Sequence, residues 1–455
     1  MGQGMKVSRS GVAHIVFAII ALLPLSCSAQ PANIDPAQTA ITLERSACYG
    51  TCPVYRVTIH GDGRVVFTTG TAPVDPVDAL HRRFAQSDGV LLPGTHEARI
   101  DPSSVVELIE KFKSAHYWQL KSTYRAPVTD SPTYVLTFDI GHQRKTVVDY
   151  VGREAGMPKA VTELENAVDQ AAGTDRWVNG SPALIPWLEQ TGFDFHSDQA
   201  VELVNAAAWG DGAEETVIGL IDRGAPLDRI VGIRGSSPMS TIAEPQTAGI
   251  FMLESAIRRG QANVFKRLVA SGWLDKLGKD KAAEVFSKNA GGCSPALVDA
   301  AGEAGIGVDK PSKEEPSYPG AAQGKTALAE LGSSYACEEK EDLLVKVAER
   351  LIARGANPNA RDSLGRTPIY GVENLALLRF LLQHGADATV KDNDGRSMVF
   401  GSWTDAIVLE LLEARASPVG KYDIDGNKTL AQQAKDRKMP LVAKWLTDHP
   451  EAYKR

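Results

Sequence analysis

Two cysteines near the N-terminus have a spacing that could support redox chemistry. Cys48 and Cys52 enclose three residues, in the run CYGTC. A reactive dithiol usually has two intervening residues and a helix N-terminus that lowers a thiol pKa, whereas a strand-like segment follows here. A zinc site would need a second Cys or His pair at ligand spacing, and none lies nearby. The pair therefore favours a structural disulfide over a redox or metal site.

The other residues that could do chemistry fit no catalytic or metal-binding pattern. Four histidines occur singly, which favours surface or edge positions: His60, His81, His96 and His116. The acidic runs 392–395 (DNDG) and 423–426 (DIDG) suggest calcium, but an EF-hand register places Val390 or Lys421 at the first ligand position. We interpret both runs as hairpin turns. No GxSxG, HExxH or phosphate-binding glycine loop occurs in a suitable context, so we expect no catalytic residue, cofactor or metal.

One group of residues keeps an enzyme hypothesis open. Tyr49, Tyr55 and Asp130 could form an unrecognised site in the N-terminal half, with the C-terminal half serving as a targeting arm. A deep pocket that gathers these groups with perturbed pKa values would favour this reading. A flat sheet with a filled core would count against it.

The first 29 residues have the organisation of a signal peptide. Lys6 and Arg9 supply positive charge, residues 16–23 are continuously apolar, and small residues follow. Two processing routes stay open, because the run LPLSC ending at Cys27 is also similar to a bacterial lipobox, although Pro24 departs from it. We therefore expect an exported protein, either periplasmic or anchored to a membrane by a lipid on Cys27.

Four cysteines remain after processing. In an oxidising compartment Cys48, Cys52, Cys293 and Cys337 allow up to two disulfides, with three possible connectivities. Pairing Cys48 with Cys52 and Cys293 with Cys337 keeps one bridge in each apparent domain. The connectivity itself is not determined by the sequence.

Residues 39–178 show the alternation of a sheet with two helices. Tyr55, Val57 and Ile59 alternate with polar residues. The expected strands are 41–45, 54–60, 64–69, 133–140 and 144–150. Helices are expected after the cap at Asp101 and after Pro158. We predict an α+β domain with an antiparallel sheet and both helices on one face.

This domain resembles an uncharacterised bacterial family found in exported proteins. The resemblance rests on residues 48–55 (CYGTCPVY), 61–63 (GDG) and 129–132 (TDSP), and on the closing Trp177. It implies export and a common fold, and no activity is attached to the family. Residues 174–182 are polar and rich in turn formers, which predicts a linker.

The C-terminal half is organised by a repeat. Pairs of landmark residues recur thirty positions apart: Gly355 with Gly385, Asp362 with Asp392, and Gly365 with Gly395. Thr367 and Pro368 suit the start of a first helix. Leu378, Leu381 and Leu382 give a second helix its apolar stripe, and Gly385 suits its C-terminus.

This run resembles an ankyrin repeat closely, and weaker copies occupy residues 197–449. We count about seven units, with an inserted loop at 310–319. A single unit cannot bury both faces, so a stack is expected. The whole chain is therefore predicted to be α+β at the N-terminus, followed by an all-α ankyrin-repeat solenoid.

The repeats favour a protein-binding module as the leading function. A net charge of −7 without long basic runs argues against nucleic acid as a partner. The expected partner is another protein, contacted by variable residues at the hairpin tips. These candidates are Arg361, Ser363, Leu364, Lys391, Asn393, Tyr422 and Ile424. An envelope structural or immunity-type protein remains an alternative.

Overall fold

The computed structural model describes residues 34–454 except 51, 71–88, 142, 210–213, 232–245, 313–321, 334–336, 338–340, 403 and 421–427. The predicted signal peptide (1–29), Cys27, His81, Tyr422 and Ile424 lie outside the described residues. No helix within the described ranges is both long and apolar enough to span a bilayer.

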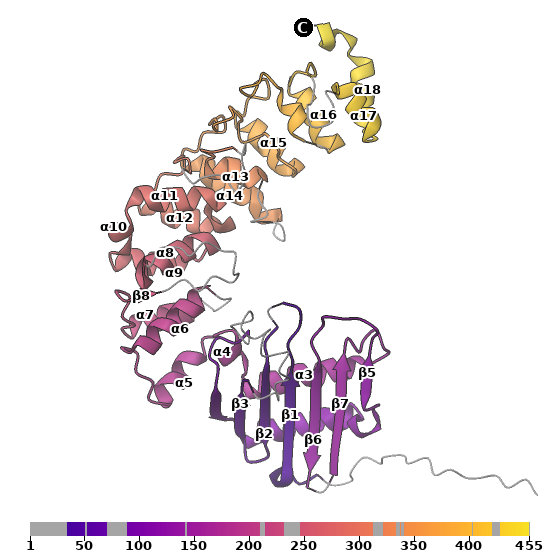
Figure 1. Cartoon of the computed structure of the whole chain (residues 1–455), viewed down its shortest axis with the longest axis vertical. Helices are drawn as coiled ribbons and strands as arrows, with labels where there is room; N and C mark the ends of the chain where they lie inside the picture. The colour runs from indigo at the N-terminus through magenta and orange to yellow at the C-terminus, as the bar shows by residue number, and fades with distance from the viewer. Residues whose placement is uncertain are drawn as a thin grey trace, which may run out of the picture.

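A seven-stranded mixed sheet forms the N-terminal domain (Figure 1). Its strands are β1 (Thr39–Arg45), β2 (Tyr55–His60), β3 (Arg64–Thr68), β4 (Thr95–Arg99), β5 (Thr123–Arg125), β6 (Tyr134–Ile140) and β7 (Gln143–Tyr150), in the order β4-β3-β2-β1-β6-β7-β5. The two predicted hairpins, β2–β3 and β6–β7, are present and antiparallel. The alternation that predicted β2 is visible as burial of Tyr55, Val57 and Ile59.

Two features of this sheet differ from the prediction. Strand β4 was not predicted, because its sequence THEAR has no apolar alternation. Strand β5 was not predicted either, and it pairs parallel with β7, so the sheet is mixed. A strand of three residues contains too little pattern to be recognised from alternation.

Helices α2 (Pro102–Ser114) and α3 (Lys159–Ala172) pack against each other and cover one face of the sheet (Figure 1). The predicted cap of α2 is present, since the Asp101 carboxylate accepts a hydrogen bond from the Ser103 amide at 2.8 Å. Helix α3 buries Val161, Leu164 and Val168, which lie on one face of the helix. Both predicted helices of the domain are therefore confirmed.

The predicted linker 174–182 is instead a packed junction. It contains the short helix α4 (Asp175–Val178), whose Trp177 is fully buried. The Trp177 ring lies 5.0 Å from that of Phe67 and 5.7 Å from that of Trp187 in α5 (Leu184–Gln190). Trp187 in turn donates from Nε1 to the Glu97 carbonyl of β4 at 2.8 Å. The polar composition of the segment concealed the aromatic anchor that joins the two halves.

The C-terminal half is an array of helix pairs that curves away from the sheet (Figure 1). Its α-helices are α6 (Asp198–Trp209), α7 (Glu214–Asp222), α8 (Ala248–Arg259), α9 (Ala262–Ala270), α10 (Trp273–Leu277), α11 (Lys279–Lys288), α12 (Pro295–Glu303), α13 (Ala327–Ser333), α14 (Glu341–Ala353), α15 (Leu375–Gln383), α16 (Asp405–Glu413), α17 (Leu430–Asp436) and α18 (Pro440–Asp448). First helices α6, α8, α11 and α13 contact one another in sequence, as do second helices α7, α9, α12 and α14.

One unit departs from the expected helix pair. The first helix predicted to begin at Thr367 is a single turn, in which the Tyr370 amide donates to the Thr367 carbonyl at 2.9 Å. Gly371 follows with a φ of 77°, a left-handed conformation that ends the helical path. The second helix of this unit, α15, begins normally after its cap Asn374. The following unit is similarly reduced, with a 3₁₀ helix at Met398–Gly401 before α16.

Both disulfides join cysteines within the same domain, as in the first of the connectivities considered above. Cys48 is joined to Cys52, and Cys293 to Cys337, each with a Cα to Cα distance of 5.6 Å. The second bridge connects the turn between α11 and α12 to the segment between α13 and α14. It therefore spans the insertion that interrupts the repeat.

The junction generates the first prediction. Replacing Trp187 with Ala should destabilise the protein by about 3–5 kcal/mol and separate the unfolding of the sheet domain from that of the array. Differential scanning calorimetry should then resolve two transitions. Val106→Ala, on the exposed side of α2, is the control. A single unchanged transition in Trp187→Ala would show that the junction does not couple the two halves.

The two bridges should differ in their contribution to stability. Loop-closure entropy assigns roughly 2 kcal/mol to the bridge of separation 4 and roughly 4 kcal/mol to the bridge of separation 44. We therefore expect Cys293→Ser/Cys337→Ser to lower the urea midpoint about twice as much as Cys48→Ser/Cys52→Ser. Equal losses would contradict this entropic origin.

Candidate protein-binding surface

The described tip residues lie on the two neighbouring hairpin turns before and after α15. Arg361, Ser363, Lys391 and Asn393 are exposed, and Leu364 is half-buried. Asp362 and Asp392 close these turns in the same way, since each carboxylate accepts a hydrogen bond from the amide four residues later at 2.9 Å. The aspartates at the thirty-residue spacing are thus the residues that shape the tips.

Several tip residues also hold the two hairpins together. Arg361 donates from Nη2 to the Lys391 carbonyl at 2.8 Å. Asn393 donates from Nδ2 to the Ser363 carbonyl and from its amide to the Leu364 carbonyl, both at 2.9 Å. Within the described part of the chain, the Lys391 side chain makes no hydrogen bond or ion pair. Lys391 is therefore the tip side chain best placed to meet a partner.

A second set of hydrogen bonds links successive units near the ends of their second helices. The Asp309 carboxylate accepts from the Asn357 amide at 3.1 and 2.9 Å. In the next unit Asn359 accepts from the Asp387 amide at 2.8 Å and donates to the Gly385 carbonyl at 2.8 Å. Asp309 and Asn359 each lie four residues after a glycine that follows a second helix. An Asp or Asn at this position is a sequence signal that the repeat analysis did not weigh.

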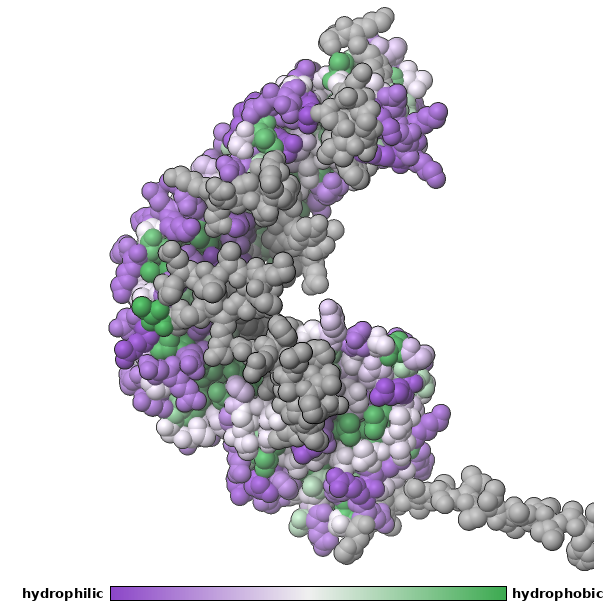
Figure 2. All heavy atoms as spheres, in the orientation of Figure 1, coloured by the Kyte–Doolittle hydropathy of each residue, from purple (hydrophilic) through white to green (hydrophobic). Residues whose placement is uncertain are grey.

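Ion pairs connect neighbouring helices along the array, whose outer side is mainly hydrophilic in Figure 2. Three of these pairs each join one arginine to one carboxylate. They are Arg223 with Glu189 at 2.6 Å, Arg267 with Asp222 at 2.6 Å, and Arg379 with Glu410 at 2.9 Å. At this exposure each contributes about 0.2–1 kcal/mol. Such pairs fix the relative orientation of neighbouring helices more than they stabilise the fold.

The residues of the enzyme hypothesis are not gathered into one site. Tyr49 is 90% exposed and Tyr55 only 6% exposed. Tyr49 touches Asp130 through the backbone, its amide donating to the Asp130 carbonyl at 3.1 Å. The Tyr55 hydroxyl instead donates to Asp169 of α3 at 2.7 Å, on the buried side of the sheet.

Asp169 is the centre of a polar cluster between α3 and the sheet. Besides Tyr55, it accepts from the Thr174 hydroxyl at 2.9 Å and from Arg45 Nε at 3.0 Å. The Arg45 guanidinium also lies 4.4 Å from the centre of the Tyr134 ring. Burial and the Asp169 charge raise the pKa of Tyr55. Tyr55 is therefore a hydrogen-bond donor to Asp169, and a poor general base at neutral pH.

Glu165 lies one turn from Asp169 on the same side of α3 and is 2% exposed. Its Oε1 atom has no hydrogen-bond partner among the described residues. Burial, with the nearby charge of Asp149, raises its pKa to about 8. The carboxyl is thus protonated at neutral pH. Burial of Glu165 was not predicted, because an acidic residue in an amphipathic helix normally faces the solvent.

Within the described residues, no group of three His, Cys, Asp or Glu side chains is arranged to hold a metal ion. His96 packs against the junction aromatics and has a ring nitrogen 2.9 Å from the Leu92 carbonyl. His60 lies 3.0 Å from an Arg64 nitrogen. These histidines have structural neighbours.

Comparison with known families identifies the sheet domain. The family described as a domain of unknown function (DUF6438) matches residues 39–172. Residues 39–172 are a DUF6438 domain. The match covers the strands and helices from β1 to α3 and ends just before the Trp177 junction. No curated protein sequence matches the chain.

Among solved structures, the array is similar to the crystal structure of the ankyrin repeat domain of Bcl-3, a member of the IkappaB protein family. The similarity covers 51% of this chain and 91% of that chain, with 19% identity and a TM-score of 0.30. In this chain the helix pairs, the intervening hairpin turns and the stacking of first on first and second on second helices define an ankyrin-repeat-like array.

The buried carboxyl of Glu165 generates a pH prediction. Its pKa is higher in the folded state than in the unfolded chain, so its contribution to stability is complete below about pH 4.5 and is lost as the pH rises through 8. The total change is on the order of 5 kcal/mol. Glu165→Gln should therefore match the parent protein at pH 4.5 and be more stable at pH 8.5.

Chemical denaturation of both proteins across this range measures the effect. Glu163→Gln, on the exposed side of the same helix, is the matched control and should leave the pH profile unchanged. Parallel profiles for the parent and Glu165→Gln would show that Glu165 titrates normally.

Proposed function

We propose that this chain is an exported protein that binds another protein through its helical array and performs no catalysis itself. The observation that carries the proposal is the stacking of successive helical units, which continues through α15 and α16 although their first helices are reduced, and which leaves the described hairpin tips exposed. Arrays of this kind typically present an extended surface to a partner protein.

Export is supported by the arrangement of the cysteines together with the signal-peptide pattern of residues 1–29. All four cysteines outside that segment are paired in disulfides, and such bonds persist in oxidising compartments such as the periplasm. The mature protein is then either soluble in the periplasm or attached to a membrane through a lipid on Cys27. The intact mass of the protein purified from envelope fractions distinguishes these two forms.

The polar side chains considered for an enzyme site in the DUF6438 domain are not gathered into one site, which supports a role without catalysis. Arg45, Tyr55 and Asp169 satisfy one another beneath the sheet. Tyr49, which is fully accessible, stands apart from them. Envelope structural and immunity-type roles are variants of the same binding function, because each acts through a bound protein.

Lys391 provides the test of this function. A photo-crosslinking amino acid at position 391 should capture a discrete partner in the native envelope. With the purified partner, Lys391→Glu should weaken binding by about tenfold or more, because it reverses an exposed charge at the tip. Isothermal titration calorimetry measures the loss.

Lys266→Glu is the matched control, since Lys266 is exposed on a second helix away from the tips. It should bind with the parent affinity. Equal affinity of the parent and Lys391→Glu, or equal losses in both variants, would overturn the assignment of the tips as the binding surface.

A further inference from the structure

Several helices of the array meet at η3 (Ala290–Cys293), a short 3₁₀ helix between α11 and α12. It contacts α8, α11, α12, α13 and α14. Its approach to the end of α8 is so close that both chains have glycine there, since a Cβ on Gly292 would lie 2.3 Å from the Gly260 amide nitrogen. The conformation of η3 therefore affects how the units on both sides of it stack.

The backbone of η3 has a conformation that its sequence does not favour. Ala290 and Cys293 have φ values of 46° and 50°. These lie in the left-handed region, where a Cβ atom comes too close to the following carbonyl oxygen. Gly292, with a φ of 62°, has no Cβ and adopts the same region readily. Unfavourable backbone conformations persist only where the surrounding structure holds them, so η3 needs a contact from outside its own sequence.

The disulfide between Cys293 and Cys337 supplies such a contact. It joins the last residue of η3 to a residue 44 positions later, which lies between α13 and α14. Both cysteines are buried, with 5% and 4% of their surface exposed. A thiolate must reach a sulfur atom to break a disulfide. A soluble thiol therefore reaches this bond only after the surrounding helices separate.

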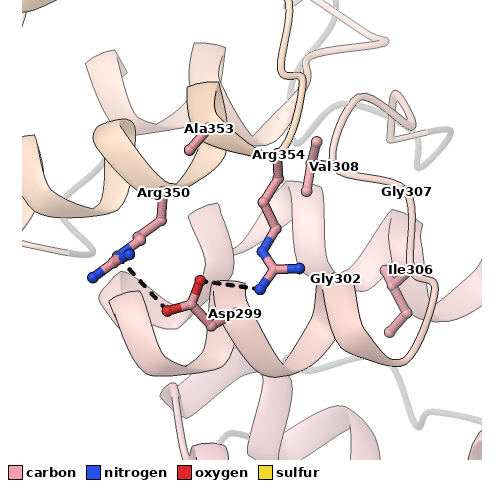
Figure 3. A pocket seen from close by; sticks show the side chains of 8 residues that line it. All are labelled: Asp299, Gly302, Ile306, Gly307, Val308, Arg350, Ala353 and Arg354. Carbon is pink, nitrogen blue, oxygen red and sulfur yellow. Dashed lines mark hydrogen bonds and ion pairs between the residues drawn. The ribbon is translucent and has the colours of Figure 1, made fainter.

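The contact between α12 and α14, across the insertion, includes a cavity of about 460 Å³ (Figure 3). Beside the cavity, Arg350 and Arg354 of α14 both pair with Asp299 of α12, at 3.7 and 3.2 Å. The two arginine side chains are 55% and 28% exposed. Ion pairs with this much exposure contribute little to stability. This part of the contact therefore does little to hold the two units together.

We infer that the Cys293–Cys337 disulfide is a redox latch, which completes the stack across the insertion only after the two thiols are oxidised. While the thiols are free, Ala290 and Cys293 leave the left-handed region, and α13 and α14 are not held against α11 and α12. Once the helices close over the bond, they protect it from reductants. The latch determines when the array is assembled, whatever the array binds, so its failure would leave the proposed function unaltered.

The oxidation is a thiol–disulfide exchange with a small disulfide, for which glutathione disulfide is the example. The two cysteine thiols give up two protons and two electrons, and one S–S bond forms between them. The S–S bond of the oxidant breaks and takes up these protons and electrons, which releases two glutathione thiols.

Hydrogen exchange measured by mass spectrometry tests the latch. In the full chain with Cys27, Cys48 and Cys52 replaced by serine, only Cys293 and Cys337 remain to pair. After refolding with excess reductant, peptides from α11, α12 and α14 should exchange about tenfold or more faster than in the oxidised chain. Peptides from β6 and β7 should exchange at the same rate in both forms.

The parent chain, compared in the same two states, should show the same difference between the array and the sheet. Equal exchange of α14 in its reduced and oxidised forms would overturn the latch. Faster exchange of β6 and β7 to the same extent as α14 would overturn it as well, because the bond would then stabilise the whole fold.

The kinetics of oxidation separate a latch from a bond that forms in an array already closed. Glutathione disulfide is added to the reduced serine variant, and samples are quenched with N-ethylmaleimide to count free thiols. Protection of α14 should appear at the rate at which the bond forms. Dithiothreitol should then reduce the bond about tenfold or more slowly without urea than with it. Full protection before the bond forms, or equal rates of reduction, would contradict the inference.

Two variants of the parent chain compare the covalent and ionic contacts. Cys293→Ser/Cys337→Ser should reproduce the fast exchange of the reduced chain. Arg354→Gln removes the shorter ion pair between α12 and α14 and should change the exchange of α14 by less than about twofold. Equal increases in the two variants would show that the ion pair, and not the disulfide, holds the units together.

Discussion

The burial of Trp177 is the contact on which the architecture depends. A repeat unit cannot bury both of its faces alone, so a stack needs a surface on which to begin. Here the sheet domain supplies that surface, where the Trp177 indole packs against Phe67, His96 and Trp187. Each later helix pair packs on the one before it. The apolar core accordingly runs from the sheet through the array as one connected cluster.

The fold was largely predictable because its pattern is local. Alternation identified β2, the cap at Asp101 identified α2, and the three-and-four spacing of leucines identified α15. Strand β5 was not predicted, because it is three residues long and forms only by pairing with β7, which comes later in the chain. Trp177 was singled out only for the family resemblance, and its burial was not predicted, because burial of a single aromatic in a polar segment depends on what folds beside it.

The binding surface was less predictable, because neighbours thirty residues apart decide which side chains remain available. The hairpin sequence correctly marked Asp362 and Asp392 as structural, but it did not show that Asn393 bonds to the preceding hairpin. The cavity beside Asp299 required knowing that α12 and α14 become neighbours across an insertion. Among the predicted tip residues that the structure describes, Lys391 has an exposed side chain that bonds to no other described residue.

The hydrogen bond between Asp309 and Asn357 shows how the array accommodates an insertion. It repeats the bond between Asn359 and Asp387, although the first joins residues 48 positions apart and the second residues 28 positions apart. The contact between successive units therefore keeps the same geometry whether or not extra residues lie between them in the sequence. An insertion at this point changes the length of the chain and leaves this contact between successive units in place. The spacing of the units in space is thus set by the contact and is separate from their spacing along the sequence.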